Sequence, residues 1–283
     1  DGAPLEQTLD GAWKFFYAQT PGASPQEFYR EGYDVSGWDE IAVPGYIQLQ
    51  GGGKYGTPHY VNTQYPWDGH ERLEPPAVPE RYNPVGCYVR GFAVPQSWDG
   101  PVCVRFDGVE TAFAVWCNGV FIGYSEDSFT PAEFDLTPAV HRDGENRLAV
   151  RVYRFSSASW LEDQDFFRFS GIFRPVFLYA KAPVHLEDLW LRAGLEEDNT
   201  TGTLAPRLKL SAAEGALPAD TAVHCRVTAP GGTEAGGSVR GRGDADAGRK
   251  NGAGPCDGRA CGVGAARGTP ASVERRGAGA LHL

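Results

Sequence analysis

Apolar side chains recur at every second position along most of this chain, which is the pattern of β-strands packed against one core. The strongest case is a hairpin in which two alternating runs, 112–117 and 120–124, are joined by Asn118-Gly119. That pair tolerates the positive φ angles of a type I′ turn. Because a helical period is almost absent, we predict an all-β chain whose first part, residues 1–182, is a jelly-roll sandwich.

Two changes of pattern predict the remaining organisation. Lys181-Ala182-Pro183 ends the preceding strand and a new alternating run begins directly after it, so we predict a hinge there. Residues 183–230 contain too few strands for a complete immunoglobulin-like sandwich, and we expect an incomplete one. Residues 231–283 are rich in Gly, Ala and Arg and have no aromatic residue. We predict a disordered tail and interpret it as a shifted reading frame.

Charge and hydropathy disfavour several classes of partner. The formal net charge of −10 over 283 residues opposes binding to nucleic acid. No apolar run approaches the ~20 residues of a membrane helix, and no secretion signal opens the chain, so we predict no membrane association and a cytoplasmic location. The cysteines lack metal-ligand spacing, which predicts neither a zinc site nor a disulfide framework.

The run from Ser159 to Phe173 mixes three carboxylates and a carboxamide with many aromatic rings. Rings cover the apolar C–H faces of a pyranose while acids and amides bind its hydroxyls, so this mixture favours a carbohydrate site. The alternative is a solvated acidic loop between two buried strands. A second long segment, 45–84, is rich in Gly, Pro and Tyr, and its aromatic residues argue against disorder.

Several stretches together resemble the amino-terminal part of the large, lactose-cleaving β-galactosidases of glycoside hydrolase family 2. They run in the order VPGYIQLQ, GTPHYVNTQYPW, NPVGCYV, FDGVETAFAVWCNGVFIGYSEDSFTPAEFDLT, GENRLAVRV and WLEDQDFFRFSGIFRPV. The resemblance implies a sugar-binding jelly roll, an immunoglobulin-like domain and a catalytic TIM barrel that hydrolyses terminal β-D-galactosides with two glutamates. We find no barrel repeats here and expect a fragment, truncated before the barrel and without the usual leader, that is inactive alone.

Two site residues are implied by the resemblance. Asn62, in the YVNTQYP stretch, is similar to the family asparagine that reaches the galactose pocket, with a turn amide as the alternative reading. Asp165, the last acid of EDQD, is similar to the aspartate that contacts the sugar and helps to bind sodium. Full-length members use sodium and magnesium and are homo-oligomers; we expect neither ion to bind this fragment tightly. A free-standing carbohydrate-binding module is the alternative function.

Neighbouring polar and aromatic residues receive structural interpretations. Glu162 and Asp163 are adjacent on a strand and face opposite sides, so we assign them to loop hydrogen bonds or to an ion pair with Arg168. Trp116 alternates inward in the hairpin, which predicts a core side chain. The run Glu126-Asp127-Ser128, which follows the hairpin, is expected to cap a turn.

Overall fold

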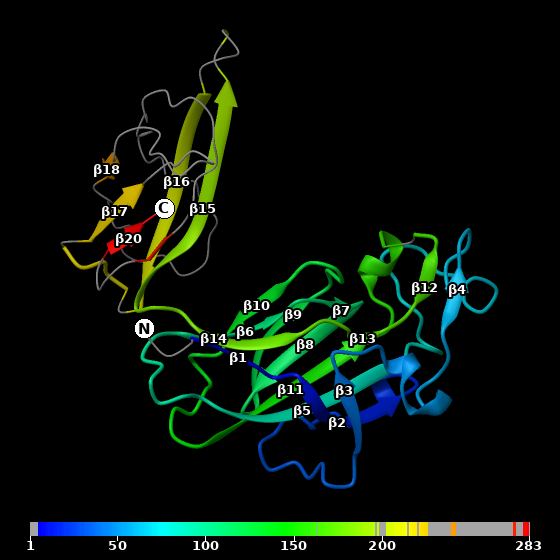
Figure 1. The fold of residues 1–283 in the computed structure, drawn as a ribbon. Helices are drawn as coiled ribbons and strands as arrows, with labels where there is room; N and C mark the ends of the chain where they lie inside the picture. The colour runs from blue at the N-terminus through cyan, green and yellow to red at the C-terminus, as the bar shows by residue number, and fades with distance from the viewer. Residues whose placement is uncertain are drawn as a thin grey trace. The chain divides into compact units, whose positions relative to one another are not determined.

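The computed structural model describes residues 5–162, 164–195, 197, 202–213, 215–219 and 221–225, and three short strands nearer the C-terminus. The chain divides into two compact units, Asp1–Ala180 and Lys181–Leu283 (Figure 1). Each unit has its own sheets, and the candidate site lies in unit 1.

Unit 1 is a sandwich of two antiparallel sheets. The smaller sheet has the order β1 (Glu6–Thr8), β14 (Val176–Ala180), β6 (Val102–Phe106) and β10 (Ala132–Asp135). The larger has the order β3 (Asp39–Val43), β2 (Gly11–Ala18), β5 (Val85–Ala93), β11 (Glu145–Tyr153), β8 (Ala112–Cys117) and β9 (Val120–Ser125). This architecture confirms the predicted all-β sandwich.

Smaller elements accompany the two large sheets. Two further pairs of short strands are β12 (Phe166–Arg168) with β4 (His59–Val61), and β13 (Gly171–Ile172) with β7 (Val109–Glu110). The 3-10 turns are η1 (Pro21–Ala23), η2 (Ile47–Leu49), η3 (Gly51–Gly53) and η4 (Ser157–Trp160). The β4–β12 pair, which we call the ribbon, lies at one edge of unit 1 (Figure 1).

The core fills the space between the two large sheets. Trp13 and Phe15 of β2 are fully buried, as are Val104 of β6 and Leu178 of β14 from the facing sheet. The indole N–H of Trp13 donates to the carbonyl of Leu9 at 2.9 Å, so this large ring is buried with its polar atom satisfied. Burial of these large apolar side chains is the main stabilisation of the sandwich.

Residues 24–38 cover the outer face of the six-stranded sheet and form a second apolar cluster around Phe28. Trp116 lies in this cluster, half-buried and stacked on Tyr29 at 5.1 Å, while its neighbours Val115 and Cys117 face the inner core. The prediction that Trp116 points into the main core is therefore wrong. The covering segment comes from far away in the sequence and buries a face that alternation alone assigns to solvent.

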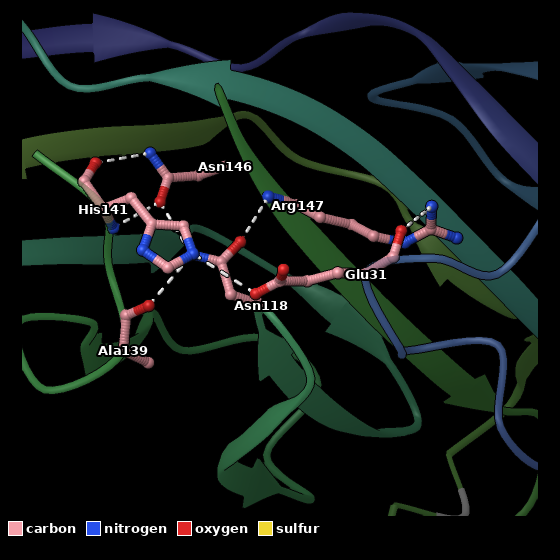
Figure 2. A network of polar contacts seen from close by, with 6 residues as sticks. All are labelled: Glu31, Asn118, Ala139, His141, Asn146 and Arg147. Carbon is pink, nitrogen blue, oxygen red and sulfur yellow. Dashed lines mark hydrogen bonds and ion pairs between the residues drawn. The ribbon is translucent and has the colours of Figure 1, made fainter. Parts of the chain in front are cut away.

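The predicted hairpin is confirmed, and its turn is held by amides. Asn118 and Gly119 have φ values of 48° and 81°, as a type I′ turn requires. The Asn118 side chain donates to the Ala139 carbonyl at 2.9 Å and to Asn146 Oδ1 at 2.8 Å, and its oxygen accepts from the Arg147 N–H at 2.8 Å (Figure 2). We call this group the turn network.

Unit 2 contains one long hairpin and a small sheet. The hairpin pairs β15 (Val184–Leu195) with β16 (Gly202–Ala212), and the sheet has the order β18 (Val239–Gly241), β17 (Ala222–Cys225), β20 (Ala280–His282) and β19 (Glu274–Arg275). Apart from these strands, the predicted disordered tail 231–283 lies outside the described residues. The boundaries 1–182 and 183–230 and the incomplete immunoglobulin-like sandwich stay predictions. Within the described part of the chain, no helix has the length and apolarity needed to cross a bilayer.

Candidate functional site

The ribbon brings the two predicted site residues together. Its antiparallel register pairs Tyr60 with Phe167 and Val61 with Phe166. One step further along the same register, Asn62 lies opposite Asp165. Two residues that are far apart in the sequence are thus neighbours at one end of the ribbon, which we call the ribbon tip.

The hydroxyl of Tyr60 joins the two residues of the ribbon tip. It donates a hydrogen bond to the carboxylate of Asp165 and is also within hydrogen-bond reach of the Asn62 side chain. The bond to Asp165 raises the pKa of Tyr60 because a carboxylate acceptor stabilises the protonated phenol, while Asn62 acts in the opposite direction. All three side chains are exposed, so their remaining donors and acceptors face solvent.

A row of aromatic rings leads away from the ribbon tip. Tyr60 packs on Phe167, Phe167 on Phe169, and Phe169 on Tyr46, with ring centroids 5.5, 5.5 and 4.6 Å apart. Tyr46 also stacks on Phe173 at 5.0 Å. Tyr60 and Phe167 are each about half exposed, so apolar ring surface lies directly beside a carboxylate and an amide. This combination suits the mixed polar and apolar faces of a sugar.

Two carboxylates fix the loop that leads into Asp165. Glu162 accepts from the hydroxyl and the backbone N–H of Ser128, at 2.6 and 3.1 Å. Glu126 accepts from the Ser157 hydroxyl at 2.6 Å and from the Ala158 N–H at 3.0 Å, and it therefore caps the turn η4 as expected. Glu162 makes the predicted loop hydrogen bonds, and Asp163 lies outside the described residues.

Aromatic packing also orders the long segment 45–84. Tyr65 stacks on Trp67 at 5.2 Å, and Trp160 packs against both rings. The Trp160 indole N–H donates to the carbonyl of Ala77 at 2.8 Å. Trp160 is therefore a packing residue of this segment, and the surface offered to a ligand is the row that begins at Tyr60.

Behind the ribbon lies a small pocket with buried charges. Its wall includes Glu110, Arg154, Glu162 and Arg168. Burial raises the pKa of Glu110 to about 7, and the charge of Glu162 adds to this; Arg168, the Phe169 N–H and Arg154 act in the opposite direction. None of the sequence patterns above singles out Glu110 or Arg154 as part of a site.

These residues supply only part of the coordination that a cation needs. In the described ranges, no three His, Cys, Asp or Glu side chains come together in a way that could hold a metal. Asp165 offers carboxylate oxygen, the hard ligand that alkali and alkaline-earth ions prefer, but it also accepts from Tyr60. Asp165 therefore fits an ion as one ligand rather than as a complete site.

Comparison with known proteins identifies the family of the larger part of this chain. Residues 6–183, more than half of the chain, match the family model described as glycosyl hydrolases family 2, sugar binding domain. A β-galactosidase of Halalkalibacterium halodurans is 56% identical over 207 residues, which are 73% of this chain and 20% of that protein. A β-galactosidase of Clostridium acetobutylicum is 51% identical, over 74% of this chain and 23% of that protein.

Solved structures share the fold at low identity. A β-glucuronidase of Ruminococcus gnavus, in complex with uronic deoxynojirimycin, has a TM-score of 0.60 and 15% identity over 94% of this chain and 39% of that one. A β-glucuronidase of Bacteroides uniformis has a TM-score of 0.59 and 22% identity over 83% of this chain and 25% of that one. These likenesses show the same all-β fold.

The fold and the family match thus define the class of unit 1, a β-sandwich of the sugar-binding type. The chain belongs to glycosyl hydrolase family 2, as the sequence resemblance implied, and residues 6–183 form the sugar binding domain of that family. The chain spans about a fifth of the length of the curated β-galactosidases named above.

Proposed function

We propose that this chain is the amino-terminal part of a β-galactosidase and that its ribbon tip supplies Asn62 and Asp165 to the galactosyl-binding site. The observation that carries the proposal is the meeting of these two side chains at the exposed hydroxyl of Tyr60. The Asn62 amide offers both a donor and an acceptor, whereas the Asp165 carboxylate only accepts. Together they suit the hydroxyls of one hexose, with the Tyr60 ring beside them.

The role of the ribbon tip in this proposal is to position the sugar. The acid/base and the nucleophile of a retaining glycosidase are two carboxyls about 5 Å apart across the scissile bond. We propose that both belong to the remainder of the enzyme and that this chain alone does not hydrolyse galactosides. Sodium, with Asp165 as one ligand, and magnesium are parts of the same proposal. The homo-oligomeric state and the cytoplasmic location stay predictions.

A chimera tests the positioning role. Residues 6–183 replace the matching region of the Halalkalibacterium halodurans β-galactosidase, and kcat/KM is measured with a chromogenic galactoside. We expect an active chimera in which Asp165→Asn lowers kcat/KM roughly 10- to 100-fold, because a hydrogen bond to a charged group is lost. Asp68→Asn, at an exposed carboxylate that accepts from the Tyr65 N–H, is the matched control and leaves kcat/KM unchanged. Equal kcat/KM in the two variants would refute the proposal.

The purified chain tests the second half of the proposal. We expect no turnover of the chromogenic galactoside, and hydrolysis that disappears in Asp165→Asn would show that the chain is an enzyme on its own. Titration with galactose and lactose distinguishes the alternative function. Millimolar or tighter binding by the isolated chain would support a free-standing carbohydrate-binding module.

A further inference from the structure

The ribbon has little support of its own. Its strands are three residues each, and it belongs to neither of the two large sheets of unit 1. An isolated two-stranded pair of this length is at best marginally stable in water. Contacts outside the ribbon must therefore fix the place at which its tip presents Asn62 and Asp165.

One buried guanidinium supplies such contacts to both strands. Arg154 directly follows the core strand β11 and is only 2% exposed. Its Nη2 donates to the carbonyl of Thr57 at 3.1 Å and to the carbonyl of Arg168 at 2.8 Å. Thr57 precedes β4 by two residues, and Arg168 is the last residue of β12. A single nitrogen thus bridges the two strands at the end opposite the ribbon tip.

The backbone of Arg154 is itself fixed to the sandwich. Its N–H donates to the carbonyl of Pro84 at 2.9 Å, just before β5, and its carbonyl accepts from the Thr111 hydroxyl at 3.2 Å. The guanidinium is held as well, because Nη1 donates to the Tyr82 hydroxyl at 3.3 Å. Arg154 is therefore hydrogen-bonded to both the sandwich and the ribbon, and it fixes the ribbon relative to the core.

The charge of Arg154 has a buried counterpart on the same side of the ribbon. Glu110 is 3% exposed, interacts electrostatically with Arg154 and Arg168, and accepts a hydrogen bond from the backbone N–H of Phe169. Phe169 is the first residue after β12, so this carboxylate fixes the strand one residue beyond the point that Arg154 holds. A planar guanidinium reaches three acceptors from two nitrogens in a fixed geometry, which an ammonium group does not reproduce.

We propose that Arg154 is a positioning residue, which sets the geometry of Asn62, Tyr60 and Asp165 by bridging β4 and β12 to the sandwich. The contribution of these three side chains to sugar binding rests on the proposed function. The bridge itself does not, because it is made of hydrogen bonds within the chain.

The test compares Arg154→Lys with Arg147→Lys in the full chain. Arg147 lies on β11 and also donates to two backbone carbonyls, those of Phe28 and Glu31, but it does not contact the ribbon. NMR spectroscopy follows amide exchange at 59–61 and 166–168 and the nuclear Overhauser contacts between the Tyr60 ring and the Asp165 side chain. We expect Arg154→Lys to speed exchange of the ribbon amides roughly tenfold relative to β5 and to abolish the Tyr60–Asp165 contacts. Arg147→Lys leaves both unchanged.

A purely stabilising role would give a different result. If Arg154→Lys lowers the melting temperature but keeps the ribbon exchange and the Tyr60–Asp165 contacts of the wild type, the proposal is overturned. If that variant does not fold, hydrogen exchange in the wild-type protein tests the proposal instead. The η protons of Arg154 must then exchange with solvent through the same opening as the ribbon amides, and independent exchange overturns the proposal. The effect of Asp165→Asn on kcat/KM of the chimera is scored separately, so a failure of the proposed function is distinguished from a failure of the bridge.

Discussion

Asn118 and Asn62 each lie in a cluster of polar side chains, and the two clusters differ in what their polar atoms bind. In the turn network, the Asn118 amide uses its oxygen and its nitrogen on partners within the protein, two of which are backbone groups (Figure 2). At the ribbon tip, the contacts described above connect Asn62 and Asp165 to the exposed hydroxyl of Tyr60 and to no backbone group. An amide saturated by backbone has a structural role, whereas an exposed amide keeps its capacity for a ligand.

The buried groups behind the two clusters also differ. The turn network rests on Asn146, a neutral amide that is 1% exposed, while the ribbon rests on the ionisable groups Glu110 and Arg154. Burying a neutral amide costs little once it is hydrogen-bonded, but burying a carboxyl group shifts its pKa and so makes stability depend on pH. The stability of unit 1 should therefore respond to pH through Glu110 behind the ribbon.

The largest expected effect is this pH dependence. The pKa of Glu110 is raised from 4.5 to about 7, so the folded protein holds this proton more tightly than the unfolded chain. The resulting stabilisation is complete below pH 4.5 and is lost as the pH rises through 7. Relative to Glu110→Gln, the free energy of unfolding of the wild type should fall by about 3 kcal/mol across this window.

Urea unfolding followed by tryptophan fluorescence at a series of pH values measures this difference. Glu40→Gln, an exposed glutamate that pairs with Lys14, controls for the loss of one negative charge. Parallel stability curves for the wild type and Glu110→Gln would show that Glu110 does not couple the ribbon to pH.

The second-largest effect is expected from a substitution that breaks the turn network. Asn146 accepts from the His141 N–H at 2.6 Å and from Asn118, and it donates to the His141 carbonyl at 2.9 Å (Figure 2). Asn146→Ala leaves these partners unsatisfied and should lower the free energy of unfolding by roughly 2 kcal/mol at every pH. Urea unfolding measures the loss, and NMR contacts at Tyr60 should not change. A shift at Tyr60 would mean that the two regions are coupled.

The third effect concerns the backbone of the same turn. A Cβ at position 119 would meet no atom nearer than 3.9 Å, so the cost of Gly119→Ala comes from its φ of +81°. We expect a loss of about 1 kcal/mol in the free energy of unfolding. Gly37→Ala, where a Cβ has open space and φ is ordinary, is the matched control. If both variants lose the same stability, the left-handed turn does not account for the effect.

The smallest expected effect on stability is at the ribbon tip. Asp165→Asn removes the carboxylate that accepts from Tyr60, so the pKa of Tyr60 should fall toward its ordinary value while the melting temperature does not change. NMR titration with tyrosine labelled in the ring, assigned by Tyr60→Phe, measures the pKa. A melting temperature lowered as much as in Asn146→Ala would make the tip a structural cluster like the turn.

Local patterns predicted most of the fold. The hairpin followed from alternation and from the Asn118-Gly119 pair, because a type I′ turn is decided by adjacent residues. The prediction for Trp116 was wrong because its environment depends on a covering segment that alternation does not reveal. Packing between distant segments, rather than strand formation, limited the prediction.

The candidate site was predicted in part. Asn62 and Asp165 came from the resemblance, and their proximity required the pairing of β4 with β12. The same register brings the Tyr60 hydroxyl to Asp165, a contact that the sequence patterns did not predict. Arg154 has no local signal, since a charged residue after a strand usually faces solvent. Its burial depends on acceptors at Tyr82, Thr57 and Arg168, which only the folded chain brings together.

The separation of the ribbon from both large sheets has an evolutionary consequence. Substitutions in β4 and β12 alter the side chains at the tip without changing the strand pairing of the sandwich. Arg154 donates hydrogen bonds to two main-chain carbonyls of the ribbon segments, and these carbonyls are present whatever residues occupy those positions. The sandwich is therefore a scaffold on which recognition of a different sugar could evolve by exchanging two short peptide segments.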